Sequence, residues 1–256
     1  MGQRSSLVVI GNEILSGRTA DKNINWIAEQ MTGRGVPLTE VRIVPDIETK
    51  IVEAVNALRE EYDYVFTTGG IGPTHDDITA ASVAKAFGVE FERHEEAYQV
   101  LLEYYGPAEL TEARATMANM PRGARLLDNP VSGAPGFAIE NVYVMAGVPR
   151  IMQAMLEHVI AEITPGAAIL SNTVFCDLQE SLIAQGLREI QGQYAVVDIG
   201  SYPSFRCGVL NVSVVLRGTD GMAVAAATKE VLALIDEKGG VIRSQSFQVD
   251  VDLDLD

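Results

Sequence analysis

The stretch that decides the fold reads Thr67-Thr68-Gly69-Gly70-Ile71-Gly72-Pro73-Thr74-His75-Asp76-Asp77. It follows an apolar run at 64–67, which predicts a buried strand, and it precedes residues 78–87, whose spacing predicts a helix. Its glycines let the backbone turn sharply and bring amides close to a ligand, while the proline fixes part of the turn. Because amides at the start of a helix attract anions, the stretch predicts a phosphate-binding loop.

A simpler interpretation of this loop is a tight turn between strand and helix, in which Thr74 or Asp76 caps the helix. The consecutive carboxylates Asp76 and Asp77 argue for more than a turn, because two acidic groups beside a phosphate need a compensating charge. A divalent cation that bridges carboxylate and phosphate supplies that charge.

Two further groups of polar residues follow predicted strands. The segment Gly11-Asn12-Glu13-Ile14-Leu15-Ser16-Gly17 comes after the apolar run 7–10, and Asp46 comes after the next predicted strand. Ligands of parallel α/β sheets bind at the carboxyl ends of the strands, so we expect Asn12, Glu13 and Asp46 at the same edge as the glycine loop. A polar turn capped by Asn12 and an ordinary loop aspartate remain the alternatives.

The alternation of strands and helices predicts the fold of the first two-thirds of the chain. The expected strands are 7–10, 40–44, 64–67 and 143–146, and the expected helices are 23–30, 49–59, 78–87, 95–104, 110–117 and 150–163. This order is typical of a mostly parallel sheet covered by helices on both faces. We therefore expect a three-layer α/β/α domain over residues 5–167.

The pattern changes near 164–166. The segments that follow predict a strand, a helix, two strands and a helix, with 241–244 as a candidate last strand. We expect a second, smaller α+β domain over residues 168–248. Residues 249–256 alternate Asp with apolar residues, which indicates either a frayed acidic tail or a weak edge strand, and we expect the tail.

Composition excludes several classes of function. The 256-residue chain has a formal net charge of −16, which disfavours contact with nucleic acid and with anionic membranes. Its two cysteines, Cys176 and Cys207, form no CxxC pair, so neither a disulfide framework nor a zinc site is expected. The run 7–10 is too short for a signal peptide, and no segment is apolar enough to span a membrane. We expect a cytoplasmic protein.

Three of these motifs carry a family resemblance. The stretches 11–15, 67–77 and Ala134-Pro135-Gly136-Phe137 resemble motifs of the competence/damage-inducible protein A family, whose N-terminal domain is related to molybdopterin-binding proteins. Gly147-Val148-Pro149 resembles the Gly-Pro-Pro that follows a later strand in that family. The resemblance covers most of residues 6–165, and it implies the molybdopterin-binding-like α/β fold.

Residues 168–245 resemble the small KH-like domain that follows in the same family, notably at Gly200-Ser201-Tyr202-Pro203-Ser204. No GxxG loop stands in this part of the chain, so we expect no RNA binding. Full-length members of the family end in a further nicotinamide-nucleotide amidase domain. This chain has no segment that corresponds to it, and no amidase activity is expected.

The resemblance implies two groups of activity. Competence-type relatives, and the similar domain fused to some FAD synthases, are associated with metal-dependent cleavage of dinucleotide pyrophosphates such as ADP-ribose or FAD. Molybdopterin-type relatives bind or adenylylate the pterin. The aspartates on which they rely correspond to Asp46 and Asp77 here. The pairs Asn12-Glu13 and Asp76-Asp77 look more like the competence-type branch.

We therefore expect a metal-dependent hydrolase that cleaves the pyrophosphate bond of ADP-ribose, FAD or NAD. Asp77, Asp76 and Glu13 are expected to be catalytic and to hold a divalent metal, either Mg, Mn or Co. The expected ligand-binding residues are Asn12, Asp46, Thr68, Gly69, Gly70, Gly72, Pro73, Thr74 and Gly136. This set contains no Lys or Arg, so the metal is expected to neutralise the phosphates.

Two alternatives remain open, a molybdopterin-binding or adenylylating protein and a non-catalytic nucleotide-binding protein. The expected partner in each case is a small nucleotide or pterin, with no nucleic acid and no membrane. The family also implies a homodimer or a larger homo-oligomer. Among the histidines, His75 is a candidate contact for phosphate or metal, whereas His94 and His158 lie on predicted helices and are expected to be surface or partly buried structural residues.

Overall fold

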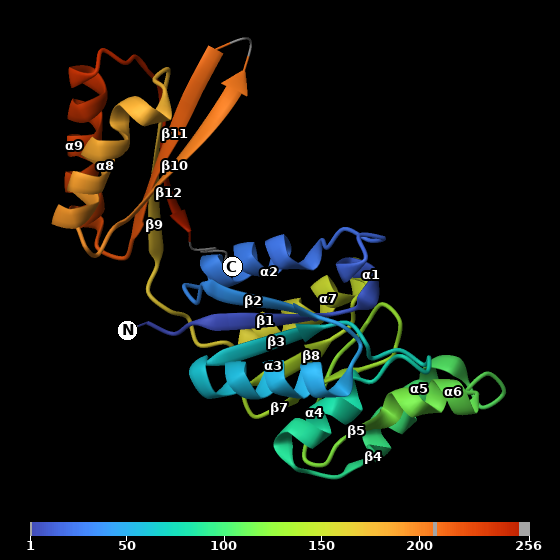
Figure 1. Cartoon of the computed structure of the whole chain (residues 1–256). Coiled ribbons are helices and arrows are strands. Elements are labelled where there is room, and N and C mark those ends of the chain that lie inside the picture. The colour runs from blue at the N-terminus through green and yellow to red at the C-terminus, as the bar shows by residue number, and fades with distance from the viewer. Residues whose placement is uncertain (1, 207–208, 251–256) are drawn as a thin grey trace. The chain divides into compact units, whose positions relative to one another are not determined.

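The computed structural model describes residues 2–206 and 209–250, and the chain divides into two compact units, Met1–Gly166 and Ala167–Asp256. The first unit contains a mostly parallel six-stranded sheet between helices, and the second an antiparallel sheet with two helices (Figure 1). The predicted fold class, a three-layer α/β/α domain with a smaller α+β domain, is confirmed. None of the helices in the described residues is long and apolar enough to cross a membrane.

The sheet of the first unit has the strand order β2-β1-β3-β8-β7-β6. Strands β2, β1, β3 and β8 run parallel, whereas β7 runs antiparallel to both β8 and β6. The strands are β1 (Ser5–Ile10), β2 (Leu38–Val44), β3 (Tyr64–Thr68), β6 (Arg125–Leu127), β7 (Gly136–Ile139) and β8 (Val142–Met145). The parallel strands end at one edge, because Val9 is paired with Thr68 and Thr68 with Met145.

Helices cover both faces of this sheet, with α2 and α7 on one side and α3 and α4 on the other (Figure 1). Strand β1 needs cover on both faces because its central residues are all apolar. Leu7 and Val9 pack into the core that contains Met152 of α7, whereas Val8 and Ile10 pack into the core on the opposite face. The helices are α1 (Asn12–Leu15), α2 (Asn23–Gly33), α3 (Glu48–Glu61), α4 (Thr79–Phe87), α5 (Glu95–Tyr105), α6 (Glu112–Ala115) and α7 (Pro149–Glu162).

The segment between α4 and β6 differs from the sequence prediction. The helix expected at 110–117 is the short α6 followed by a 3₁₀ turn, η1 (Thr116–Ala118). A two-stranded ribbon of β4 (Phe91–Arg93) and β5 (Asn119–Pro121) brackets α5 and α6, and it was not predicted. Strands of three residues are too short to show a period of two, so the pattern could not reveal them.

The second unit has the strand order β10-β11-β9-β12, and every neighbouring pair is antiparallel. Its elements are β9 (Ile169–Cys176), α8 (Glu180–Gln193), β10 (Asp198–Arg206), β11 (Val209–Gly218), α9 (Gly221–Glu237) and β12 (Ile242–Asp250). Both helices pack on one face of the sheet, where Val174, Val214 and Val231 share a core with Ile183.

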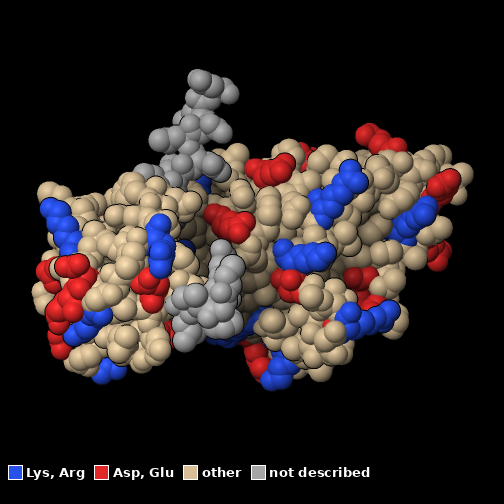
Figure 2. Space-filling model, turned by 90° about the horizontal axis from the view of Figure 1, so that it is seen from above, with Lys and Arg blue, Asp and Glu red and all other residues tan. Residues whose placement is uncertain are grey.

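The prediction places the start of the acidic tail, at residue 249, two residues too early. Strand β12 continues to Asp250 because its backbone pairs with β9 as far as Ile169, so the first two residues of the segment 249–256 belong to the sheet. Residues 251–256 lie outside the described part of the chain. On the face shown in Figure 2, the described Lys and Arg side chains are interspersed with Asp and Glu.

Candidate functional site

The glycine loop is held close against the carboxyl end of β1. Gly69 and Gly70 have φ values of 101° and 67°, a region that side chains rarely adopt. A Cβ atom on Gly69 would lie 2.2 Å from the carbonyl oxygen of Ile10, and one on Gly70 would lie 2.2 Å from Oγ1 of Thr79. Both glycines are therefore required by sterics, and they carry the backbone directly over the sheet edge.

We expect Gly69→Ala to destabilise the first unit by about 3 kcal/mol, because backbone strain is joined by a collision with main-chain atoms that cannot move aside. Gly88→Ala is the matched control, since Gly88 also has positive φ but a Cβ there meets no atom within 4 Å. Thermal unfolding should show a loss of about 6 °C or more for Gly69→Ala and a clearly smaller loss for Gly88→Ala. Equal losses would contradict the close approach to Ile10.

Asp77 closes the loop on itself. Its Oδ2 accepts a hydrogen bond of 2.8 Å from the backbone amide of Thr74 and lies 2.5 Å from the Thr74 hydroxyl. That hydroxyl also lies 2.6 Å from Oδ1 of Asp76, so one proton is shared between two carboxylates. A Cβ on Gly72 would lie 2.7 Å from Asp77 Oδ2, which shows how closely this carboxylate approaches the glycine backbone.

The expected capping role is not found. Helix α4 begins at Thr79, and its N-cap residue Ile78 offers no side-chain hydrogen bond, so neither Thr74 nor Asp76 caps it. Asp77 lies just before the N-cap residue, outside the helix. The hydrogen bond from Thr74 keeps the pKa of Asp76 below its usual range, with a backbone hydrogen bond acting in the same direction.

A cavity of about 710 Å³ opens on one side of the loop. Glu13 and Asp77 both line it, so the structure brings together carboxylates that are 64 positions apart. Arg114 lines the same cavity and was missed from the sequence, where only a metal was expected to neutralise phosphate. Its guanidinium lies 4.3 Å from the centre of the Tyr105 ring, and its Nη1 donates to the carbonyl of Glu109 at 2.7 Å. The side chain is thereby held in place beside the cavity.

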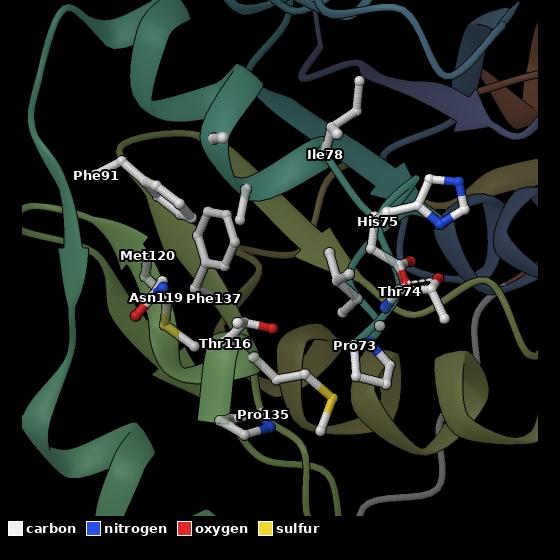
Figure 3. A pocket seen from close by; sticks show the side chains of 16 residues that line it. Pro73, Thr74, His75, Ile78, Phe91, Thr116, Asn119, Met120, Pro135 and Phe137 are labelled. Carbon is white, nitrogen blue, oxygen red and sulfur yellow. Dashed lines mark hydrogen bonds between the residues drawn. The ribbon is translucent and has the colours of Figure 1, made fainter. Parts of the chain in front are cut away.

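A second cavity, of about 440 Å³, is also lined by residues of the glycine loop. The two cavities share Ile71, Gly72, Pro73, Asp77 and Met117 in their walls. In Figure 3, Pro73, Thr74 and His75 lie toward one end of this second cavity, and Phe91, Phe137 and Asn119 lie toward the other. The two cavities thus adjoin each other at the glycine loop and Met117.

Several predicted site residues do not reach either cavity. Asp46 accepts the backbone amide of Asn12 at 2.8 Å, so this pair ties the ends of β1 and β2 together outside the cavities. Thr68 is buried beneath the loop with an unpaired hydroxyl. Gly136 is the first residue of β7, where a Cβ would be 2.4 Å from the carbonyl oxygen of Val144. The neighbouring Ala134 and Pro135 line the cavities instead.

His94 and His158 follow the sequence prediction, whereas the expected contact of His75 with phosphate or metal stays a prediction. The His75 side chain is 98% exposed and stands at the rim of the smaller cavity, with Nδ1 4.0 Å from Asp76. His94 is structural, because its Nδ1 accepts the amide of Ala97 and caps α5. His158 is exposed on α7.

The expected three-carboxylate metal site does not assemble. The Asp76 side chain is 62% exposed and lines neither cavity. Within the described residues, no three His, Cys, Asp or Glu side chains are close enough together to hold a metal. Glu13 and Asp77 remain as two oxygen donors beside one cavity, and this donor set fits Mg²⁺ or Mn²⁺, which commonly bind through one or two carboxylates and complete their shell with phosphates and water.

The chain is similar to proteins of known family. Residues 6–165 match the family described as "Probable molybdopterin binding domain", and residues 168–243 match "FAD synthase, middle domain". A relative from Caldivirga maquilingensis is 33% identical over 94% of this chain and 99% of its own length, and one from Pyrobaculum calidifontis is 36% identical over 77% and 79%. The solved structure of "the protein CinA with unknown function" from Thermoplasma acidophilum is 35% identical, with a TM-score of 0.60 over 62% of this chain and 97% of that chain.

Proposed function

The chain belongs to the probable molybdopterin binding domain family, and on this premise we propose that it is a metal-dependent hydrolase that cleaves the pyrophosphate bond of a dinucleotide such as ADP-ribose, FAD or NAD. Its resemblance to the competence/damage-inducible protein A family is confirmed by the CinA structure, and a FAD synthase middle domain follows the first unit in the chain. These relationships point to a nucleotide or pterin ligand. The choice of a dinucleotide rests on the site itself.

The observation that carries this proposal is the pair of cavities that meet at the glycine loop. Gly72, Pro73 and Asp77 belong to both walls. A dinucleotide has the same layout, because two bulky groups extend in opposite directions from a central diphosphate. A diphosphate on the loop would leave one half of the molecule in each hollow, with the carboxylate of Asp77 beside the bond between them.

Different residues of the site would bind the phosphates and the metal. Backbone amides of the glycine loop and the guanidinium of Arg114 would bind phosphate oxygens, since both are donors beside the larger cavity. Glu13 and Asp77 would hold the divalent metal. When bound, such a metal polarises a phosphoryl oxygen and makes water a stronger nucleophile.

The proposed reaction is a simple displacement. The oxygen of one water molecule bonds to one phosphorus, and the bond from that phosphorus to the bridging oxygen breaks. The bridging oxygen leaves with the other phosphate, and the protons of water pass to solvent or to the products. ADP-ribose would yield AMP and ribose 5-phosphate. The protein's part is to orient the diphosphate and to stabilise the charge that develops on it.

A second candidate is a protein that binds or adenylylates molybdopterin, and the description of the matched family favours it. Product analysis separates the two. Incubation with ADP-ribose, FAD and NAD, each with Mg, Mn or Co, should release AMP from at least one of them. Tight binding of a pterin with no AMP from any dinucleotide would support the second candidate, and nucleotide binding without turnover would indicate a non-catalytic protein.

We expect Arg114→Gln to raise KM for the dinucleotide about tenfold or more, because a charge-assisted hydrogen bond to phosphate contributes about 1.5–3 kcal/mol. Arg93→Gln is the matched control. Arg93 also stacks on a tyrosine, with its guanidinium 4.7 Å from the Tyr98 ring centre, but it lines neither cavity. Steady-state kinetics of both variants should show a raised KM for Arg114→Gln alone. Similar KM values for the two variants would show that Arg114 does not bind the phosphates of the substrate.

A further inference from the structure

The smaller cavity differs in chemistry from the larger one. Its far end is built from the side chains of Phe91, Phe137 and Met120, and none of the described residues that line it is a Lys or Arg. Among the described residues that line it, Asp77 is the only carboxylate, and it also lines the larger cavity. Such a wall suits an uncharged ring better than a second phosphate or a sugar.

Phe91 stands at this cavity without being part of a core. Its side chain is 45% exposed, although a phenylalanine normally buries most of its surface. It lies on β4 of the short ribbon, where it is paired with Pro121 of β5. In Figure 3 its ring and that of Phe137 lie toward the same end of the cavity. A planar ligand entering here would cover apolar surface that is otherwise in contact with water.

Asn119 supplies a polar group at the same place. It is paired with Arg93 on β4, two positions from Phe91, so Asn119 and Phe91 belong to the same face of the ribbon. Its side-chain amide is partly buried and forms no hydrogen bond with the described residues. A side-chain amide offers one donor and one acceptor group side by side. It can therefore pair with the adjacent donor and acceptor on one edge of adenine.

We propose that the smaller cavity binds the adenine base of a nucleotide whose phosphate lies on the glycine loop, with Phe91 stacking on the base and Asn119 pairing with its edge. This inference rests on the proposed function for the position of the phosphates. It adds that the protein selects its substrates by the adenine base that they share, and not by the half of the dinucleotide that differs between them. The larger cavity would then accept ribose phosphate, nicotinamide or flavin groups.

Binding of three monophosphates in the presence of Mg²⁺, measured by calorimetry, tests this inference without requiring turnover. The wild-type chain should bind AMP about tenfold more tightly than ribose 5-phosphate, as expected for one base stacked on an aromatic ring, and more tightly than GMP. Phe91→Ala should lower the affinity for AMP about tenfold and leave the affinity for ribose 5-phosphate unchanged. Asn119→Asp, which keeps the shape but loses the donor, should narrow the difference between AMP and GMP.

Val89→Ala is the matched control for Phe91→Ala, because Val89 is also an exposed apolar residue just before β4 but does not line the cavity. It should leave all three affinities unchanged. Wild-type affinity for AMP no greater than for ribose 5-phosphate would overturn the adenine site while leaving the phosphate loop in place. Failure of all three ligands to bind would overturn both. AMP binding that depends on Phe91, in a protein that cleaves no dinucleotide, would support the adenine site and reject the hydrolase.

Discussion

Replacing Asp77 with alanine should lower turnover by about 10²–10³-fold while the protein remains folded. Asp77 lines both cavities, and a charge that develops on a diphosphate bound there would need a preorganised partner. Single groups of this kind often contribute a factor of that size. The structural cost is the loss of the hydrogen bonds to Thr74, which are worth about 1 kcal/mol each. Measuring kcat and the unfolding midpoint on one purified variant separates the two effects.

Two further variants make this experiment specific. Asp77→Asn keeps an oxygen that can accept from Thr74 but removes the charge, so it should retain stability and still lose turnover. Asp76→Ala is the control, because Asp76 shares the Thr74 hydroxyl but lines neither cavity, and its turnover should stay within about threefold of wild type. Turnover above about a third of wild type in Asp77→Asn would show that this carboxylate only closes the loop.

Removing divalent cations should abolish AMP release completely, and Mg²⁺ or Mn²⁺ should restore it. In the part of the chain that the structure describes, only Glu13 and Asp77 offer carboxylates to the larger cavity, so the free protein should hold the metal weakly and lose it readily to EDTA. Phosphates of the substrate complete the metal shell in this account. The apparent metal affinity should therefore rise when the nucleotide is present.

The same treatment should leave the fold unaffected. A metal that binds weakly to the free protein contributes little to its stability, so the unfolding midpoint should not change on addition of EDTA. Full AMP release after exhaustive EDTA treatment would exclude the metal role. A large drop in the unfolding midpoint would indicate a structural metal instead.

Much of the fold could be predicted because its signals are local. The run Leu7-Val8-Val9-Ile10 is apolar at every position, as a strand buried on both faces must be, and its residues do alternate between the two cores. The loop from Gly69 could be predicted because clustered glycines between a strand and a helix indicate a sharp turn, and Gly69 and Gly70 do have positive φ in the structure. Glu13 and Asp77 were expected at one edge because parallel strands end together, and both line one cavity.

The remainder of the site depends on contacts between distant segments. Arg114, Phe91 and Asn119 all come from the region between α4 and β6, whose strands are too short to be read from periodicity. Whether an arginine faces solvent or a cavity is decided by packing, here by its stacking on Tyr105. The sequence also could not show that Asp76 lies away from the cavities while Asp77 lines both. Adjacent residues in a loop can point in different directions, and only the folded structure determines which of them reaches a cavity.

The most direct test of the proposed function is AMP formation in water enriched in ¹⁸O. Hydrolysis of ADP-ribose, FAD or NAD by the Mg²⁺-loaded protein should yield AMP and the matching monophosphate in equal amounts, with one ¹⁸O atom from solvent in one of the two products. Asp77→Asn should form both products about 10²–10³-fold more slowly. The absence of AMP from all three dinucleotides, or AMP that forms without any solvent oxygen in either product, would contradict a hydrolase at the glycine loop.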